Sequence, residues 1–226
     1  TRGWGGRVLV TLAPEMAGRD AVRRLVAAGV ILSAGHTDAT HAQMRDGFAD
    51  GFTGVTHLFN AMSPLTSRAP GVVGAALESE AWCGIIVDGR HVDPAVLRLG
   101  LRCHRLDRFM LVTDAMPCVG GDRHRFTLQG KTITVRDGAC YDGEGRLAGA
   151  DLDMASALRN AVTLLGLDLA DASRMASGAP AAFLGLADET GRIAAGLRAD
   201  LVLLDDDLAV RRTWIGGVDD GGELDA

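Results

Sequence analysis

Short apolar runs that each end in a histidine or an aspartate constrain this chain more than any other feature. Three of these runs lead to His36, His57 and His91, and a fourth, residues 109–113, leads to Asp114. Stretches with helical patterning separate them, which is typical of parallel strands that alternate with helices. Such strands bring their carboxyl ends to one rim, where α/β folds carry their chemistry. Three imidazoles and a carboxylate at one rim indicate a metal-assisted hydrolase.

The size, charge and cysteine content of the chain exclude several other classes. Its 226 residues suffice for one large domain, or for most of one plus part of another. The 23 Lys and Arg residues form no basic stripe and the net charge is −6, so we expect no nucleic-acid partner. No apolar run reaches the roughly 18 residues of a membrane span, and no signal peptide is recognisable. The four cysteines form no Cys-x-x-Cys pair, which is typical of reduced thiols in a cytoplasmic protein.

The hydrophobic periodicity predicts an alternating series of strands and helices with a β insertion. Strands are predicted at residues 8–12, 30–35, 54–56, 82–87 and 109–113. Helices are predicted at residues 19–28, 40–50, 74–80, 94–104, 153–165 and 171–184. Residues 60–74 read as a long loop, 126–141 as a β-hairpin, and 200–204 with 210–215 as terminal strands.

This pattern leaves two α/β architectures open. About five parallel strands precede the hairpin, and a complete eight-stranded barrel needs more. The chain is therefore either an open, doubly wound sheet or a barrel whose first strands lie upstream. Because the chain starts at Thr1 rather than Met, we expect that other residues precede it.

Six motifs in a fixed order identify a family resemblance. The motifs are VTLAPE at 10–15, SAGH at 33–36, THLFNAM at 56–62, DGRH at 88–91, LVTDA at 111–115 and GRIAAGLRADLV at 191–202. With these motifs the chain resembles the N-acetylglucosamine-6-phosphate deacetylase family of the amidohydrolase superfamily.

The resemblance implies a TIM-type (β/α)8 barrel, partial in this chain, with a small β-sandwich domain. Residues 1–190 would form the later strands of the catalytic barrel, with the hairpin 126–141 inserted. Residues 191–217 would supply strands of the sandwich, and 218–226 a loose acidic tail. The metal-binding glutamate of the family, in a Leu-Glu-Gly-Pro type motif, would lie upstream of Thr1.

The resemblance also implies roles for individual residues. His36 and His57 are expected to bind a divalent metal, zinc in preference to iron or another divalent ion. Asp114 is expected to be the catalytic general base and acid. Glu15 also follows a strand, but the resemblance makes it a structural residue rather than a ligand. The residues expected to bind substrate are Asn60, Ala61, Arg68, His91, Leu147, Ala148 and Gly149, with Arg68 on the phosphate group, either of its own subunit or of a neighbouring one.

The implied function is metal-dependent hydrolysis of the acetamide of N-acetylglucosamine 6-phosphate, which yields glucosamine 6-phosphate and acetate. The expected partner is thus a small amino-sugar phosphate, and the protein is expected to be a cytoplasmic homodimer without membrane contacts. Two alternatives stay open: another amidohydrolase, such as a cyclic amidase or a deaminase, and an inactive truncated fragment of this fold. A phosphate-binding loop around Arg68 would argue against an uncharged substrate.

Overall fold

A five-stranded parallel sheet with helices on its outer side forms the main body of the molecule. The computed structural model describes residues 6–221. The strands are β1 (Leu9–Leu12), β2 (Ile31–Ala34), β3 (Phe52–Val55), β4 (Trp82–Ile86) and β5 (Phe109–Val112). They lie side by side in chain order, β1-β2-β3-β4-β5, and every neighbouring pair is parallel. A doubly wound sheet reverses its strand order at a switch point, so this sequential order favours the barrel architecture, of which these strands form an arc.

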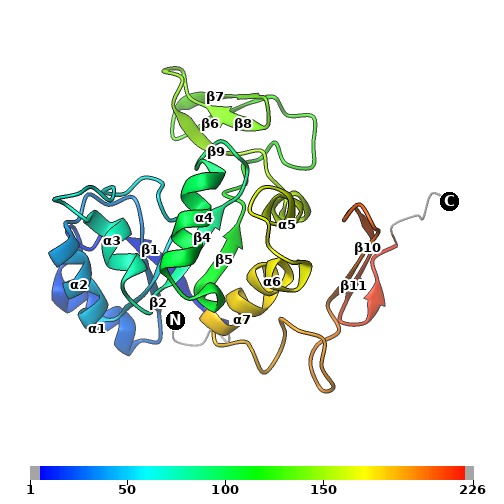
Figure 1. Ribbon diagram of the computed structural model, residues 1–226, viewed down its shortest axis with the longest axis horizontal. Helices are drawn as coiled ribbons and strands as arrows, with labels where there is room; N and C mark the ends of the chain where they lie inside the picture. Colours follow the sequence, from blue (N-terminus) through cyan, green and yellow to red (C-terminus); the bar gives the residue numbers. More distant parts are fainter. Residues whose placement is uncertain (1–5, 222–226) are drawn as a thin grey trace.

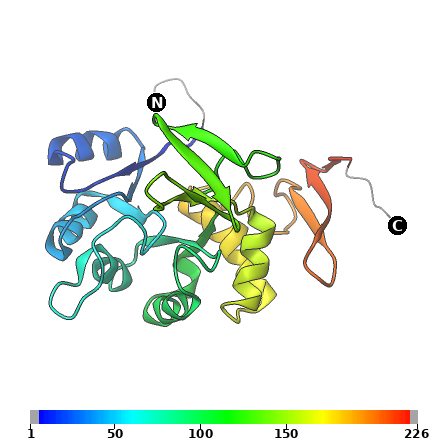
Figure 2. The same ribbon diagram turned by 90° about the horizontal axis from the view of Figure 1, so that it is seen from above.

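Helices connect successive strands. They are α1 (Arg19–Ala27), α2 (His41–Asp50), α3 (Gly71–Leu77) and α4 (Pro94–Cys103), followed by a 3-10 turn at Leu106–Arg108. Figure 2 shows them in chain order along the outside of the curved row of strands. Thr40 caps α2 in a reciprocal capping box with Gln43, and Asp93 caps α4 ahead of Pro94. The predicted helix at 74–80 was placed too late, because α3 begins at Gly71, directly after Pro70.

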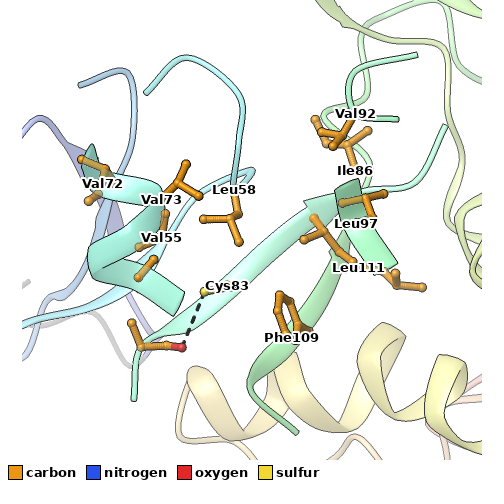
Figure 3. Close-up of a cluster of buried hydrophobic side chains, with 14 of the residues drawn as sticks. Val55, Leu58, Val72, Val73, Cys83, Ile86, Val92, Leu97, Phe109 and Leu111 are labelled. Atoms are coloured by element: carbon orange, nitrogen blue, oxygen red, sulfur yellow. Dashed lines mark hydrogen bonds between the residues drawn. The ribbon is translucent and has the colours of Figure 1, made fainter. Parts of the chain in front are cut away.

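The hydrophobic core lies between the sheet and these helices. Strand β4 is buried along nearly its whole length, as expected for a central strand with neighbours on both edges. Figure 3 shows Val72 and Val73 of α3 and Leu97 of α4 beside the buried side chains of β3, β4 and β5. This packing holds the carboxyl ends of the strands in a fixed arrangement.

A four-stranded antiparallel sheet follows β5. Its strands are β6 (Arg125–Leu128), β7 (Lys131–Arg136), β8 (Ala139–Tyr141) and β9 (Leu147–Ala150). The predicted hairpin at 126–141 is thus part of a larger insertion, which lies above the ends of β4 and β5 in Figure 1. It has its own small core, in which Cys118, Ile133 and Cys140 are buried.

The second half of the helical layer is interrupted. It consists of α5 (Met154–Thr163), α6 (Leu169–Ser173), a π-helical segment (Arg174–Gly178) and α7 (Ala179–Phe183). The sequence predicts one helix over residues 171–184, but Pro180 has no N–H to donate to residue 176, and the bonding pattern changes in front of it.

The C-terminal strands form a separate antiparallel sheet of β10 (Leu201–Leu204), β11 (Val210–Ile215) and β12 (Val218–Asp219). It lies at the far right of Figure 1, away from the parallel sheet. Val218 and Asp219, the first residues of the predicted acidic tail, pair with β11 instead of lying loose; residues 222–226 of that tail are outside the described residues. The described strands do not close a barrel or build a two-layer sandwich, so both remain predictions. Over residues 6–221, no helix has the length and apolar character needed to cross a membrane.

Candidate active site

Four polar residues occupy equivalent positions at the carboxyl ends of neighbouring strands. Each of them stands two residues after the end of its strand: His36 after β2, His57 after β3, Asp88 after β4 and Asp114 after β5. Because the strands are parallel, these positions share one rim of the sheet. Three of the four were predicted from the sequence. Asp88 was not among the predicted site residues, although it has the same offset from the end of its strand as the other three.

The backbone at this rim is unusual. His36, His57 and Asp114 have φ angles of 51°, 36° and 51°. Residues other than glycine rarely adopt this left-handed region, and where they do the surrounding structure must hold them there. The same left-handed conformation thus occurs at the same offset from the ends of three strands.

The imidazole rings of His36 and His57 converge. Their Nε2 atoms lie 3.1 Å apart, and the rings meet edge to face with centroids 4.8 Å apart. A tetrahedral zinc ion with bonds of about 2.0–2.1 Å would separate two ligand nitrogens by about 3.4 Å. The observed separation therefore fits two nitrogens that bind one metal ion.

The surroundings of His57 support the same interpretation. Only 6% of the residue is exposed, and its Nδ1 is buried without a hydrogen-bond partner. Burial lowers the pKa of His57, the Asp114 carboxylate opposes that shift, and His36 adds to it. The lowered pKa favours the neutral imidazole, which is the form that binds metals.

Within residues 6–221, no group of three or more His, Cys, Asp or Glu side chains is arranged to hold a metal ion. Catalytic zinc commonly has three protein ligands. His36 and His57 alone would therefore not complete such a set, and the predicted metal site would need a third protein ligand from outside the described residues.

Asp114 and the antiparallel insertion are joined by main-chain hydrogen bonds. The Asp114 carbonyl accepts from the Ala150 N–H at 2.9 Å, and the Met116 N–H donates to Ala150 at 3.0 Å. Gly149 adopts a φ of +93°, and a Cβ atom there would lie 3.2 Å from the Asp114 carbonyl oxygen. The predicted stretch Leu147 to Gly149 therefore runs directly beside Asp114. Asp114 itself is exposed.

The start of the long loop is tied to both histidine-bearing turns. The Asn60 N–H donates to the His57 carbonyl at 2.9 Å, and the Ala61 carbonyl accepts from the Thr37 N–H at 3.0 Å. Asn60 and Ala61 thus lie beside the predicted metal ligands. Arg68 is exposed further along this loop, and its side chain forms no hydrogen bond or ion pair with any described residue.

Glu15 supports the turn that follows His36. Its carboxylate accepts hydrogen bonds from the Thr37 hydroxyl at 2.5 Å and from the Asp38 N–H at 2.8 Å. Burial would raise the pKa of Glu15, but these hydrogen bonds outweigh it and lower the pKa. Both carboxylate oxygens are thereby engaged by protein groups.

His91 lies in the turn after β4 and is held by Asp88. The His91 Nδ1 is 2.6 Å from Asp88 Oδ2, and both side chains are almost fully buried. Burial would raise the pKa of Asp88, but hydrogen bonds from the His91 ring and from the N–H groups of His91 and Arg90 lower it. Two cavities, of about 460 and 270 Å³, lie elsewhere on the described part of the chain, and neither is lined by His36, His57, His91 or Asp114.

Comparisons with known proteins identify the family of the chain. Residues 4–219 match the amidohydrolase family. The chain is 47% identical over 212 residues to an N-acetylgalactosamine-6-phosphate deacetylase of Shewanella sp. (strain ANA-3). The aligned residues cover 92% of this chain and 53% of the relative.

Two solved structures extend the comparison to three dimensions. The N-acetylglucosamine-6-phosphate deacetylase of Pasteurella multocida superimposes with a TM-score of 0.91 and 39% identity, over 94% of this chain and 56% of that one. A mutant of the Mycobacterium smegmatis enzyme in complex with N-acetyl-D-glucosamine-6-phosphate gives a TM-score of 0.88 and 39% identity, over 93% of this chain and 57% of that one. The present chain thus spans about half the length of these relatives. It belongs to the amidohydrolase family, in the group of the amino-sugar-6-phosphate deacetylases.

Proposed function

We propose that the protein containing this chain hydrolyses the acetamide of an N-acetylhexosamine 6-phosphate and releases acetate and the free amino sugar phosphate. The observation that carries this proposal is the 3.1 Å approach of the His36 and His57 Nε2 atoms at the rim that also bears Asp114. The relatives described above are named deacetylases, which favours this reaction over a cyclic amidase or a deaminase.

His36 and His57 would hold a divalent metal ion, zinc in preference to iron. A metal ion at this point supplies Lewis-acid activation of the amide carbonyl and of water. The remaining steps belong to the protein side chains. Asp114 accepts a proton from the attacking water and then returns one to the amine nitrogen, which is a poor leaving group unless it is protonated.

The sugar phosphate would be bound by groups around the rim. Asn60, the main chain of Ala61, His91 and the stretch Leu147, Ala148 and Gly149 line the side of the sugar. Arg68 would bind the phosphate group, because a planar guanidinium pairs with phosphate oxygens bidentately. Its exposed side chain has no protein partner among the described residues and is available for such an anion.

We propose N-acetylglucosamine 6-phosphate as the preferred substrate, as the sequence motifs suggest. Its 4-epimer, N-acetylgalactosamine 6-phosphate, is a second candidate, because the Shewanella relative at 47% identity carries that name. The two substrates differ only in the direction of one hydroxyl group.

Acetate release tests the proposal. The full-length protein is assayed with both phosphorylated sugars and with unphosphorylated N-acetylglucosamine, and its metal content is measured by elemental analysis. We expect about one divalent ion per chain and turnover of a phosphorylated sugar only. Bound metal without acetate release would indicate another amidohydrolase reaction, and absence of both would support a non-catalytic protein of this fold.

Homodimerisation is also part of this proposal. The loop around Arg68 extends from the rim and would lie at the contact, where it reaches the partner's sugar phosphate. Light scattering of the full-length protein gives the oligomeric state, and a monomeric active enzyme would place Arg68 in its own subunit's site.

A further inference from the structure

The turn after β4 holds a buried carboxylate–imidazole pair that the residue roles given above do not explain. Asp88 and His91 have side chains that are 4% and 5% exposed, respectively, and Asp88 Oδ2 lies 2.6 Å from His91 Nδ1. The other oxygen, Asp88 Oδ1, accepts the N–H groups of Arg90 and His91, each at 2.9 Å. One carboxylate thus fixes both the main chain of the turn and the ring that it carries.

These contacts determine where the imidazole proton lies. An ionised carboxylate only accepts hydrogen bonds, so Nδ1 of His91 must be the donor. A neutral imidazole carries one proton, which leaves Nε2 with a free lone pair. Nε2 forms no hydrogen bond with any residue in 6–221. This atom is also not completely buried, so a ligand can reach it.

The position of the turn is fixed from a second side. The Asn160 side chain of α5 donates to the Val87 carbonyl at 2.8 Å, one residue before Asp88. The turn is therefore held between β4 and α5 rather than free to reorient, and the ring of His91 is constrained in position as well as in protonation.

We propose that Asp88 is a positioning residue for substrate binding: it keeps the His91 proton on Nδ1, so that Nε2 accepts a hydrogen bond from a hydroxyl or amide N–H of the sugar. This inference rests on the proposed function and adds to it the kind of group that His91 recognises. It places a hydrogen-bond donor of the substrate at this point of the rim, and not the amide carbonyl.

The variant Asp88→Asn separates the two tasks of the carboxylate. Two main-chain N–H groups face Oδ1, so the carbonyl of the asparagine stays on them and its NH2 group faces the ring. Nδ1 must then accept, and the proton moves to Nε2. The turn keeps its main-chain hydrogen bonds while the tautomer of His91 reverses. Asp88→Ala removes both functions and serves as the structural control.

The first measurement is the ¹⁵N NMR spectrum of the His91 ring in the metal-loaded, full-length protein without substrate. We expect the Nδ1–H tautomer in the wild type at pH 7 and the Nε2–H tautomer in Asp88→Asn, with a melting temperature closer to the wild type than that of Asp88→Ala. An imidazolium in the wild type, or the same tautomer in both proteins, would overturn the inference.

The second measurement is steady-state acetate release. We expect Asp88→Asn to raise KM about tenfold and to change kcat by less than about threefold, because a uniform binding contact is lost. In a His91→Gln background the same substitution should change KM by less than about twofold, since Asp88 acts through His91. Equal KM values for wild type and Asp88→Asn, or additive effects on KM in the double variant, would refute the inference that Asp88 positions His91. If the wild type releases no acetate, the proposed function fails, and the inference is judged on the tautomer alone.

Discussion

The Nε2 atoms of His36 and His57 lie 3.1 Å apart although the two residues follow different strands of the parallel sheet. If they share a metal ion, His36→Ala should weaken metal binding by more than the roughly 10–100-fold that loss of an outer-shell partner produces. Elemental analysis after dialysis measures this loss. His41→Ala, which removes a surface histidine paired with Glu78, is the control and should retain the metal. Equal metal content in both variants would contradict the assignment.

Asp114 should matter for turnover and not for metal content. In the proposed mechanism Asp114 accepts and returns the proton, so we expect Asp114→Asn to lower acetate release about 10²–10⁴-fold. Bound metal should stay at the wild-type level in the same preparation. Asp122→Asn changes an exposed aspartate on the insertion and should leave both quantities unchanged. A variant of Asp114 with near-normal turnover would remove it from the mechanism.

Arg68 should distinguish phosphorylated from unphosphorylated substrates. Loss of a charge-assisted contact in Arg68→Gln should raise KM for the sugar phosphate by about tenfold to a hundredfold. The weak turnover of unphosphorylated N-acetylglucosamine, if measurable, should not change. The matched control is Arg102→Gln on α4, because Arg102 is also exposed and forms no hydrogen bond or ion pair with any described residue. Equal effects of both substitutions would point to a general charge effect.

Gly149 should not tolerate a side chain. Its φ is +93°, and a Cβ atom would lie 2.4 Å from the Met116 methyl carbon. Gly149→Ala combines backbone strain with a clash, and we expect the free energy of unfolding to fall by roughly 2–4 kcal/mol. Gly145→Ala has a similar φ of +78° but open space around it, so it should cost only about 1 kcal/mol. Urea unfolding at pH 7 compares the two variants, and equal losses would show that the close approach to Met116 is unimportant.

Glu15 should contribute to stability at neutral pH but not in acid. Hydrogen bonds from Thr37 and Asp38 lower its pKa in the folded protein. Its contribution is therefore present above the unfolded pKa of about 4.3 and is lost as the pH falls through the folded pKa. We expect Glu15→Gln to unfold at lower urea concentration than the wild type at pH 7, with a smaller difference at pH 3.5. Metal content should be unchanged; a loss of metal would make Glu15 a ligand.

Much of the fold was visible in the sequence because its signals are local. Apolar runs mark the strands of the βα units, and the three residues His36, His57 and Asp114 stand just after strand ends, where the apolar pattern stops. Their place at one rim could be predicted because the carboxyl ends of parallel strands meet at the same edge of a sheet, whatever the conformation of the loops.

The errors arose where distant or main-chain contacts decide the structure. The break before Pro180 depends on which carbonyl loses its donor, and the size of the insertion depends on pairing of β8 with β9. The spacing of Asp88 from the end of β4 indicates its place at the rim, but its role in holding His91 becomes visible only in its contacts with three hydrogen-bond donors. Neither propensity nor spacing reports such contacts.

The left-handed backbone at His36, His57 and Asp114 sets this protein's function against its stability. Each of these residues costs about 1–3 kcal/mol relative to a relaxed conformation, and glycine would relieve that cost at once. A selection for thermal stability alone would therefore tend to replace these three residues. The most stable variants of this chain would then lack the residues of the candidate active site.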